Sequence, residues 1–328
     1  MNYRKLGNTD MNVSVLSYGA SSLGSVFRDT DEQESIRAVH TALDYGINYI
    51  DVAPYYGLTK AETVLGKSIK GLDRSKFYLS TKAGRYGVDN FDFSASKIIE
   101  SVDESLNRLN TDYVDMLFLH DVEFVDGDII INEAIPTLHK LKQQGKIRYC
   151  GISGLPLQVF EKLIPQVQID CILSYCHYSL NDNSLLGLLP LLEQSGIGLV
   201  NASPLSMGLL STRSAPDWHP ADQQVKDICK QAADYCAAQG YDIAKLAVQY
   251  STANHTIPTT LVSTANPQNI ANNARWVEEE LDQQLLAEVL RILEPIAHLT
   301  WSSGLPEYNE GLRFKREQRA EQGKGSEA

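Results

Sequence analysis

Four side chains that could move a proton stand at or just after the ends of short apolar segments. Asp51 ends one such segment, and Tyr56 lies in the turn that follows, between Pro54 and Gly57. Lys82 and His120 end two later segments. A carboxylate at the end of an apolar strand is costly to desolvate unless a cation meets it, and Lys82 would supply that cation. We therefore expect these four groups to form one proton-transfer site.

The chemistry of the four groups is complementary. A tyrosine hydroxyl has a pKa of about 10 and is a poor base at neutral pH. A nearby ammonium such as Lys82 favours the phenolate and should lower that pKa, while Asp51 keeps the lysine charged. His120 could orient a hydroxyl or carbonyl oxygen. Proton transfer at an oxygen, combined with hydride transfer at its carbon, requires a nicotinamide.

Each residue taken alone also has an ordinary structural interpretation. Asp51 could cap a turn, Lys82 could lie with its amine at the surface, and Tyr56 could be a loop aromatic. Only the joint placement of all four groups favours proton transfer.

A metal site is the main chemical alternative. His120 is followed by Asp121 and Glu123, a pattern that also occurs at strand ends in metal-dependent barrel hydrolases. His177 is the best placed of the other histidines, but it has no His-x-His partner. We therefore predict no metal site.

Alternating strand and helix patterns must position these residues. Strand-like segments are expected at Val15–Tyr18, Asn48–Asp51, Phe77–Lys82, Val114–His120, Arg148–Ser153, Ile169–Cys176, Gly198–Ser203 and Thr260–Ser263. Helical periodicity is clearest over Glu34–Tyr45, Ser94–Leu109, Ile135–Gln144 and Asp222–Gln239. Eight such units predict a single (β/α)8 TIM barrel, in which functional groups come from the carboxyl ends of the strands.

Segments outside the repeat complete the predicted organisation. Tyr3–Val13 should form an N-terminal β-hairpin, and Leu285–Ile292 an extra C-terminal helix. The long connection Met207–Ala221 has the length of a functional lid. We predict one barrel domain over residues 1–311, followed by a flexible polar tail over residues 312–328, which lacks apolar periodicity.

Composition limits the function classes. The 328 residues carry a net charge of −12, so no bulk attraction to nucleic acid or anionic membranes is expected. No apolar stretch approaches the ~20 residues that span a bilayer. Five cysteines in no metal or redox spacing suggest buried thiols in the cytoplasm. A small-molecule partner fits best.

The sequence lacks the usual phosphate-binding motifs. No G-x-G-x-x-G follows the first strand, which argues against a Rossmann domain. Leu65–Ser68 resembles the end of a P-loop, but the earlier glycine is Ala61 and the stretch lies in a helical pattern. A dinucleotide would have to be held by the barrel loops.

From Tyr3 to Leu305 the chain resembles the aldo-keto reductases. The matching strings are Leu6–Asp10, Asp51–Gly57, Ser80–Lys82, Tyr113–Leu117 with His120 and Asp121, Gly145–Arg148, Gly151–Ser153 and Ser203–Leu210. The resemblance implies that Tyr56 is the acid/base, that Lys82 and Asp51 tune it, and that His120 orients the substrate. It also implies an NAD(P) cofactor at Gly19, Ala20, Asp51, Ser153, Ser174, Ser203, Pro204, Leu205, Gly208, Ser263, Asn269 and Asn273.

Departures from the family pattern bear on the cofactor. Most members have Ser-Asn where this chain has Ser153 and Gly154, a glutamine where we place Ser174, and a stacking aromatic where we place Ala202. The nicotinamide would then be held by shape and hydroxyl groups. NADP-specific members place Lys and Arg against the 2′-phosphate, at positions that correspond here to Ser263 and Asn269. A phosphate dianion without a cation should bind poorly, so NAD is predicted rather than NADP.

Longer strings are similar to a plant-type subgroup of the family that oxidises L-galactose. They are Phe91–Ser94, Ser101–Leu106, Ser174–Leu180, Asn201–Leu205 and Trp218–Pro220. We therefore expect NAD-dependent oxidation of C1 of L-galactose, or a similar sugar, to the lactone. The candidate substrate-binding residues are Tyr56, His120, Phe124, His177, Trp218 and Trp301.

Two alternatives remain open at this point. The protein could act on L-fucose, D-arabinose or pyridoxal, or it could be a non-catalytic NAD(P)-binding regulatory subunit. The oligomeric state is not indicated by the sequence.

Overall fold

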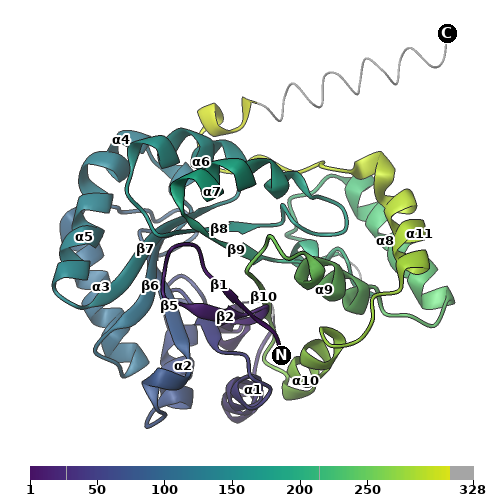
Figure 1. The fold of residues 1–328 in the computed structure, drawn as a ribbon, viewed down its shortest axis with the longest axis horizontal. Helices are drawn as coiled ribbons and strands as arrows, with labels where there is room; N and C mark the ends of the chain where they lie inside the picture. The colour runs from purple at the N-terminus through teal and green to yellow at the C-terminus, as the bar shows by residue number, and fades with distance from the viewer. Residues whose placement is uncertain (27, 214, 311–328) are drawn as a thin grey trace.

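Parallel strands form a closed barrel in the computed structural model, which describes residues 1–26, 28–213 and 215–310 (Figure 1). In the described residues the barrel contains β3 (Leu16–Gly19), β4 (Tyr49–Asp51), β5 (Tyr78–Ala83), β6 (Val114–Leu119), β7 (Ile147–Gly154), β8 (Cys171–Tyr175), β9 (Gly198–Ala202) and β10 (Thr259–Ser263). Neighbours in sequence are neighbours in the barrel, and β10 pairs with β3 to close it. The predicted TIM barrel is confirmed.

Helices surround the barrel on its outside (Figure 1). They are α1 (Glu32–Asp44), α2 (Lys60–Ile69), α3 (Ala95–Leu109), α4 (Gly127–Ile129), α5 (Ile135–Gln143), α6 (Leu157–Leu163), α7 (Leu189–Ser195), α8 (Gln223–Ala238), α9 (Ile243–Ala253), α10 (Pro267–Trp276) and α11 (Gln283–Leu293). Shorter turns are η1 (Ala20–Gly24), η2 (Arg74–Lys76), η3 (Val122–Phe124), the π-helical η4 (Ile130–Ala134), η5 (Ile164–Gln166), η6 (Ser184–Leu188), η7 (Ser206–Gly208), η8 (Glu294–Ile296) and η9 (Pro306–Tyr308). The expected extra helix is α11, which packs on α8.

Helix ends follow local chemistry. Ser94 caps α3 by accepting a hydrogen bond from Lys97 N, and Asp222 caps α8 in the same way. Gly145 and Gly240, which follow α5 and α8, have left-handed backbones with φ of 77° and 71°. Glycine adopts this conformation without strain, so both helices end where the sequence predicts.

The strands are buried on both faces, and alternate residues point into the barrel. The interior cluster contains Tyr49, Met116, Phe118, Cys171, Leu173, Val200 and Leu261. Residues between these positions, such as Ile50, Leu117 and Ile172, pack in the larger cluster that includes the surrounding helices. This alternation decides which residues at the strand ends face the barrel mouth.

The predicted hairpin, β1 (Tyr3–Lys5) with β2 (Asn12–Ser14), lies across the amino end of the barrel (Figure 1). Leu6, Met11 and Val13 have no exposed surface and pack on the interior cluster. Because the hairpin covers this end, the functional face is the carboxyl end of the strands.

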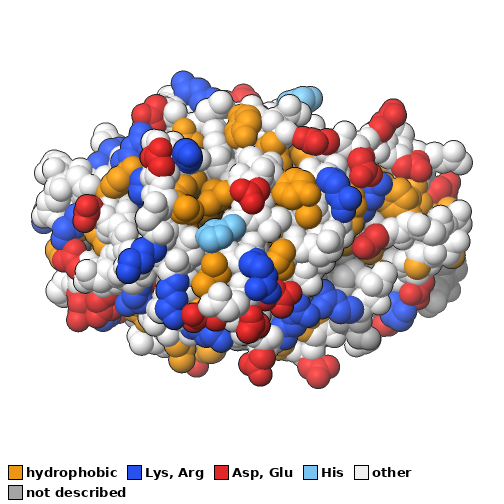
Figure 2. Space-filling model, turned by 90° about the horizontal axis from the view of Figure 1, so that it is seen from below, with side chains coloured by type: hydrophobic (Ala, Val, Ile, Leu, Met, Phe, Trp, Pro, Cys, Tyr) orange, Lys and Arg blue, Asp and Glu red, His pale blue; other side chains and the backbone are white. Residues whose placement is uncertain are grey.

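Charges of both signs are interspersed on the face seen in Figure 2, where hydrophobic side chains form small groups around a histidine. The acidic excess is therefore not gathered into one patch on this face. Among the described residues, the helices are too short or too polar to cross a membrane. The predicted tail at 312–328 lies outside the described residues.

Candidate active site

The four candidate groups meet at the carboxyl ends of β4, β5 and β6. Asp51, Lys82 and His120 are almost fully buried, with 3%, 2% and 4% of their surfaces exposed. Lys82 Nζ donates to an Asp51 carboxylate oxygen and, at 3.0 Å, to the carbonyl oxygen of Val52. Ser80 Oγ donates to the other Asp51 oxygen at 2.7 Å. Three hydrogen bonds therefore hold the Asp51 carboxylate and the Lys82 ammonium in a fixed relationship.

Tyr56 lies over this pair. The Lys82 amine is 4.9 Å from the centroid of the Tyr56 ring and also interacts with its hydroxyl. The ring of His120 meets Tyr56 edge-on at 5.7 Å and 84°, and meets Tyr55 at 5.9 Å and 73°. A phenol, an ammonium and an imidazole thus face one small volume.

A glycine contact positions the turn that carries Tyr56. Gly57 has φ of 63°, and a Cβ atom there would collide with the carbonyl of Gly24 in η1. A Cβ atom at Gly24 would in turn meet the backbone of Tyr56 at 2.6 Å. The two glycines let the turn dock directly on η1, which places the Tyr56 ring beside Lys82.

The pKa of Tyr56 differs from expectation. Burial raises it above the ordinary value, and the Lys82 ammonium opposes that rise without reversing it. We expected the lysine to lower the pKa of this hydroxyl overall; the desolvation of the ring outweighs the charge. Burial lowers the pKa of Lys82, but Asp51 and Tyr56 raise it overall, so the ammonium stays charged.

His120 is held neutral. Burial lowers the pKa of its imidazole well below the usual range, and the cations Lys82 and Arg85 lower it further. A neutral ring can donate from one nitrogen and accept at the other, which suits the orientation of a hydroxyl or carbonyl.

The candidate cofactor residues ring the same end of the barrel. Ser153 Oγ, at the end of β7, accepts a hydrogen bond from Asp121 N at 3.1 Å. Ser263, at the end of β10, bonds to Ser22 N at 3.0 Å and to the hydroxyls of Ser21 and Ser22. The remainder lie at the end of β3 or in η1 (Gly19, Ala20), in the turn after β9 (Ser203, Pro204, Leu205, Gly208) and in α10 (Asn269, Asn273).

Ser174 is the one candidate cofactor residue on a strand whose side chain points away from the barrel mouth. It is fully buried on the same side of β8 as Ile172, which faces the helices. Tyr175, its neighbour, packs on the interior cluster with Leu173 and so faces the barrel mouth. Sequence reasoning missed Tyr175, although the period-two pattern from Cys171 and Leu173 would have found it.

The candidate substrate residues divide into two groups. Phe124 stacks on Phe91 at 4.3 Å and lies near Arg85, beside the four central groups. His177 instead is buried in the loop after β8, where its Nδ1 contacts Asp182 at 3.0 Å.

Trp218 and Trp301 flank His219, with ring centroids at 5.9 and 4.9 Å. Trp218 is 51% exposed, whereas Trp301 packs in the cluster between α8 and α11. The structure therefore joins Phe124 to the central groups. It places His177 in the loop after β8, Trp218 in the connection between β9 and α8, and Trp301 in the segment after η8.

A buried carboxyl links the barrel mouth to the C-terminal segment. Glu123 Oε1 accepts from Leu155 N at 3.1 Å and from Ser303 Oγ at 2.9 Å, and its carbonyl accepts from Leu305 N. Burial, reinforced by the charge of Asp121, raises the pKa of Glu123 to about 8. Glycine at position 154 leaves room for the Glu123 carboxyl.

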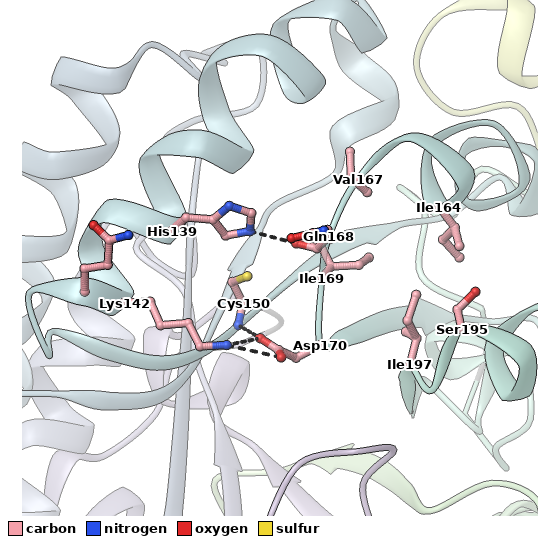
Figure 3. A pocket seen from close by; sticks show the side chains of 11 residues that line it. His139, Lys142, Cys150, Ile164, Val167, Gln168, Ile169, Asp170, Ser195 and Ile197 are labelled. Carbon is pink, nitrogen blue, oxygen red and sulfur yellow. Dashed lines mark hydrogen bonds and ion pairs between the residues drawn. The ribbon is translucent and has the colours of Figure 1, made fainter.

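A cavity of about 660 Å³ lies elsewhere, near the amino ends of β8 and β9 (Figure 3). Figure 3 shows Lys142 and Asp170 joined by an ion pair at its side, with His139 bonded to the carbonyl of Gln168 at 2.8 Å. Asp170 directly precedes β8, so this cavity is at the end of the barrel opposite to the four central groups.

The residues next to His120 that were weighed as metal ligands, Asp121 and Glu123, have other partners in the structure. Among the described residues there is no group of three or more His, Cys, Asp or Glu side chains that could hold a metal ion. Asp121 is instead paired with Arg85, and Glu123 faces the C-terminal segment.

A closed parallel barrel with tyrosine, lysine, aspartate and histidine at its carboxyl mouth defines a barrel oxidoreductase that moves protons with a side chain. The Aldo/keto reductase family model matches residues 15–294, and the chain belongs to that family. Members of this family use nicotinamide cofactors.

Individual relatives agree with this assignment. The chain is 47% identical to L-galactose dehydrogenase of Arabidopsis thaliana, over 92% of this chain and 97% of that protein. It is 37% identical to D-arabinose 1-dehydrogenase of Saccharomyces cerevisiae, over 73% and 75% of the two chains. Among solved structures, the holo form of an aldo-keto reductase from Bacillus halodurans matches with a TM-score of 0.76 and 30% identity, over 94% of this chain and all of that one.

The residues at the barrel mouth fit a nicotinamide dinucleotide. Hydroxyl groups of Ser153 and Ser263 and the amides of Asn269 and Asn273 are suitable partners for carboxamide and ribose groups. Ala202, a small and only partly buried residue at the end of β9, leaves space that a larger side chain would fill.

Proposed function

We propose that this protein oxidises C1 of L-galactose, or of a similar aldose, to the aldonolactone in an NAD-dependent reaction. The main support is the contact of Tyr56 with Lys82, which is itself paired with Asp51, beside a neutral His120. With these neighbours, the Tyr56 hydroxyl in its phenolate form can take a proton from the anomeric hydroxyl while the hydride leaves C1.

The protein's own residues divide the work in this proposal. Tyr56 takes the anomeric hydroxyl proton as a phenolate, and the charged Lys82 stabilises that anion. Asp51 keeps Lys82 protonated. His120 orients the hydroxyl without competing for the proton, because burial and the nearby cations lower the pKa of its ring and make it a much weaker base than the phenolate. A bound nicotinamide supplies the hydride acceptor.

The sugar assignment is supported by the relatives. Two of them are named as dehydrogenases of aldoses, L-galactose and D-arabinose, and the first shares nearly half of its residues with this chain over almost the full length. L-Galactose is therefore proposed first, with D-arabinose as the alternative.

The preference for NAD is supported by the surroundings of Ser263. Its neighbours in the structure are the serines at positions 21 and 22, and Asn269 bonds to Thr264 at 3.3 Å. Neutral hydroxyls and amides suit a ribose hydroxyl better than a phosphate dianion.

Initial rates over a panel of substrates test the proposal. L-Galactose, L-fucose, D-arabinose and pyridoxal would each be measured with NAD and with NADP. The highest kcat/KM is expected for L-galactose with NAD. A higher value for another compound would replace the substrate, and the absence of any turnover would favour a non-catalytic NAD(P)-binding role.

A further inference from the structure

An ion pair lies at the edge of the candidate site, beside His120. Arg85 Nη1 donates to Asp121 Oδ2, and the same carboxylate oxygen is 3.7 Å from His120 Nε2. Asp121 is only 3% exposed, whereas Arg85 remains partly exposed. The Tyr175 hydroxyl donates to Asp121 as well.

Aromatic rings hold the guanidinium in place. Arg85 lies 4.0 Å from the Tyr55 ring centroid, and 5.2 and 5.4 Å from those of Phe91 and Phe124. Its Nη2 donates to the Tyr55 hydroxyl at 3.3 Å and its Nε to the carbonyl of Gly87 at 3.4 Å. Together with the bond to Asp121, these contacts use three of the five N–H donors of the guanidinium, which leaves two for a ligand.

The backbone at Asp121 is strained, with φ of 54°. An aspartate adopts this left-handed conformation at a cost of about 1 kcal/mol. Here the turn brings the carboxylate back beside His120, the residue that precedes it in sequence. Strain of this kind is often retained at functional sites.

The chemistry of this cluster matches a neutral polyol. A carboxylate accepts from hydroxyl groups, a guanidinium donates to them, and the two charges cancel, so no net charge selects an ionic substrate. Tyr55, Arg85, Phe91, Phe124 and Tyr175 are all partly exposed around the buried His120. Aromatic rings provide the apolar surface against which the C–H groups of a sugar can pack.

We propose that Arg85 and Asp121, with the hydroxyls of Tyr55 and Tyr175, bind the ring hydroxyl groups of the sugar and so select an aldose over a simple aldehyde. This inference rests on the proposed oxidation of aldoses at this site. It assigns a specificity role to the pair, separate from proton transfer by Tyr56.

The test compares two substrates on the same enzyme. The kcat/KM for L-galactose with NAD is divided by the kcat/KM for 4-nitrobenzaldehyde with NADH, because the aldehyde has no ring hydroxyls. Arg85→Met should lower this ratio by about 10- to 100-fold, the effect of losing a hydrogen bond to a charged group. Arg85→Lys should restore part of it, and Asp121→Asn should also lower it.

Controls separate specificity from folding. The ratio does not depend on the fraction of folded enzyme, since both activities use the same preparation. Arg291→Met removes an exposed arginine of α11 that pairs with Glu288, and should leave the ratio unchanged.

Each outcome decides the inference. If the wild type oxidises L-galactose but both activities of Arg85→Met fall in parallel, the Arg85–Asp121 pair has only a structural role. The proposed function would then still stand. A wild-type enzyme that reduces the aldehyde but oxidises no aldose would overturn both.

Discussion

The ammonium of Lys82 is bonded to the carboxylate of Asp51 on the neighbouring strand, and both side chains are buried. A buried ion pair of this kind is expensive to form and adds little stability by itself. Its value in this protein is that Lys82 retains its charge beside the Tyr56 hydroxyl, where burial alone would favour the neutral amine.

Tyr56→Phe should remove the proton-transfer group and leave the rest of the site in place. We expect kcat to fall by about 10²- to 10⁴-fold, the usual contribution of a general acid or base. NAD binding, followed by quenching of protein fluorescence, should change little. Retention of most of the turnover would show that another group takes the proton.

The rate of aldose oxidation should rise from neutral toward alkaline pH, because burial raises the pKa of Tyr56 and the phenolate forms only as pH increases. In Lys82→Met the opposing charge is lost, so the rising limb should move about 1–3 pH units higher. The pH profiles of kcat for the two proteins measure this shift. Lys230→Met, at an exposed pair on α8, serves as the control.

Glu123→Gln should change how stability depends on pH. The carboxyl has a pKa of about 8 in the folded protein and about 4.5 when unfolded, so the folded state binds this proton more tightly. The proton on Glu123 therefore adds to the free energy of unfolding. This contribution is complete below pH 4.5 and is lost as pH rises through 8. Thermal melts should therefore show Glu123→Gln gaining on the wild type from pH 5 to pH 9; a constant difference would contradict the raised pKa.

Ser263→Lys combined with Asn269→Arg should move cofactor preference toward NADP. The added cations would pair with a 2′-phosphate, and we expect the NADP-to-NAD ratio of kcat/KM to rise by about 10-fold or more. Gln268→Arg, an exposed site on the same helix, controls for added charge. Wild-type preference for NADP would refute the assignment outright.

Gly57→Ala should loosen the turn that carries Tyr56. The new Cβ would collide with the Gly24 carbonyl, so we expect a loss of about 2–4 kcal/mol in the free energy of unfolding and a parallel loss of activity. Gly71 has a similar positive φ but open space around it, and Gly71→Ala should cost only about 1 kcal/mol. Denaturant unfolding of both variants makes the comparison, and equal losses would argue against the glycine contact.

The barrel could be predicted because its strands are short apolar runs that end in polar residues. The residue at which each strand ends was harder to predict. We expected Cys176 and Ser203 to belong to strands, but their φ values of 65° and 59° take them out of the sheet. The inward residue at the end of β8 is Tyr175 and not Ser174, because it continues the alternation of Cys171 and Leu173.

The Arg85–Asp121 pair illustrates what sequence could not supply. Its members belong to two loops, 36 residues apart, and meet only because β5 and β6 are neighbours in the barrel. In the sequence, Asp121 is a candidate only for a metal site, and Arg85 belongs to no motif. Arg85 and Asp121 meet because the loops after β5 and β6 pack together, and their spacing in the sequence does not predict this contact.

The hairpin at the amino end has a kinetic consequence. Leu6, Met11 and Val13 pack against the interior cluster at that end, so we expect ligands of the four central groups to arrive from the carboxyl end of the strands. If the dinucleotide binds beneath the sugar at this end, it can leave only after the sugar has left. Binding and release should therefore follow a fixed order, last in and first out.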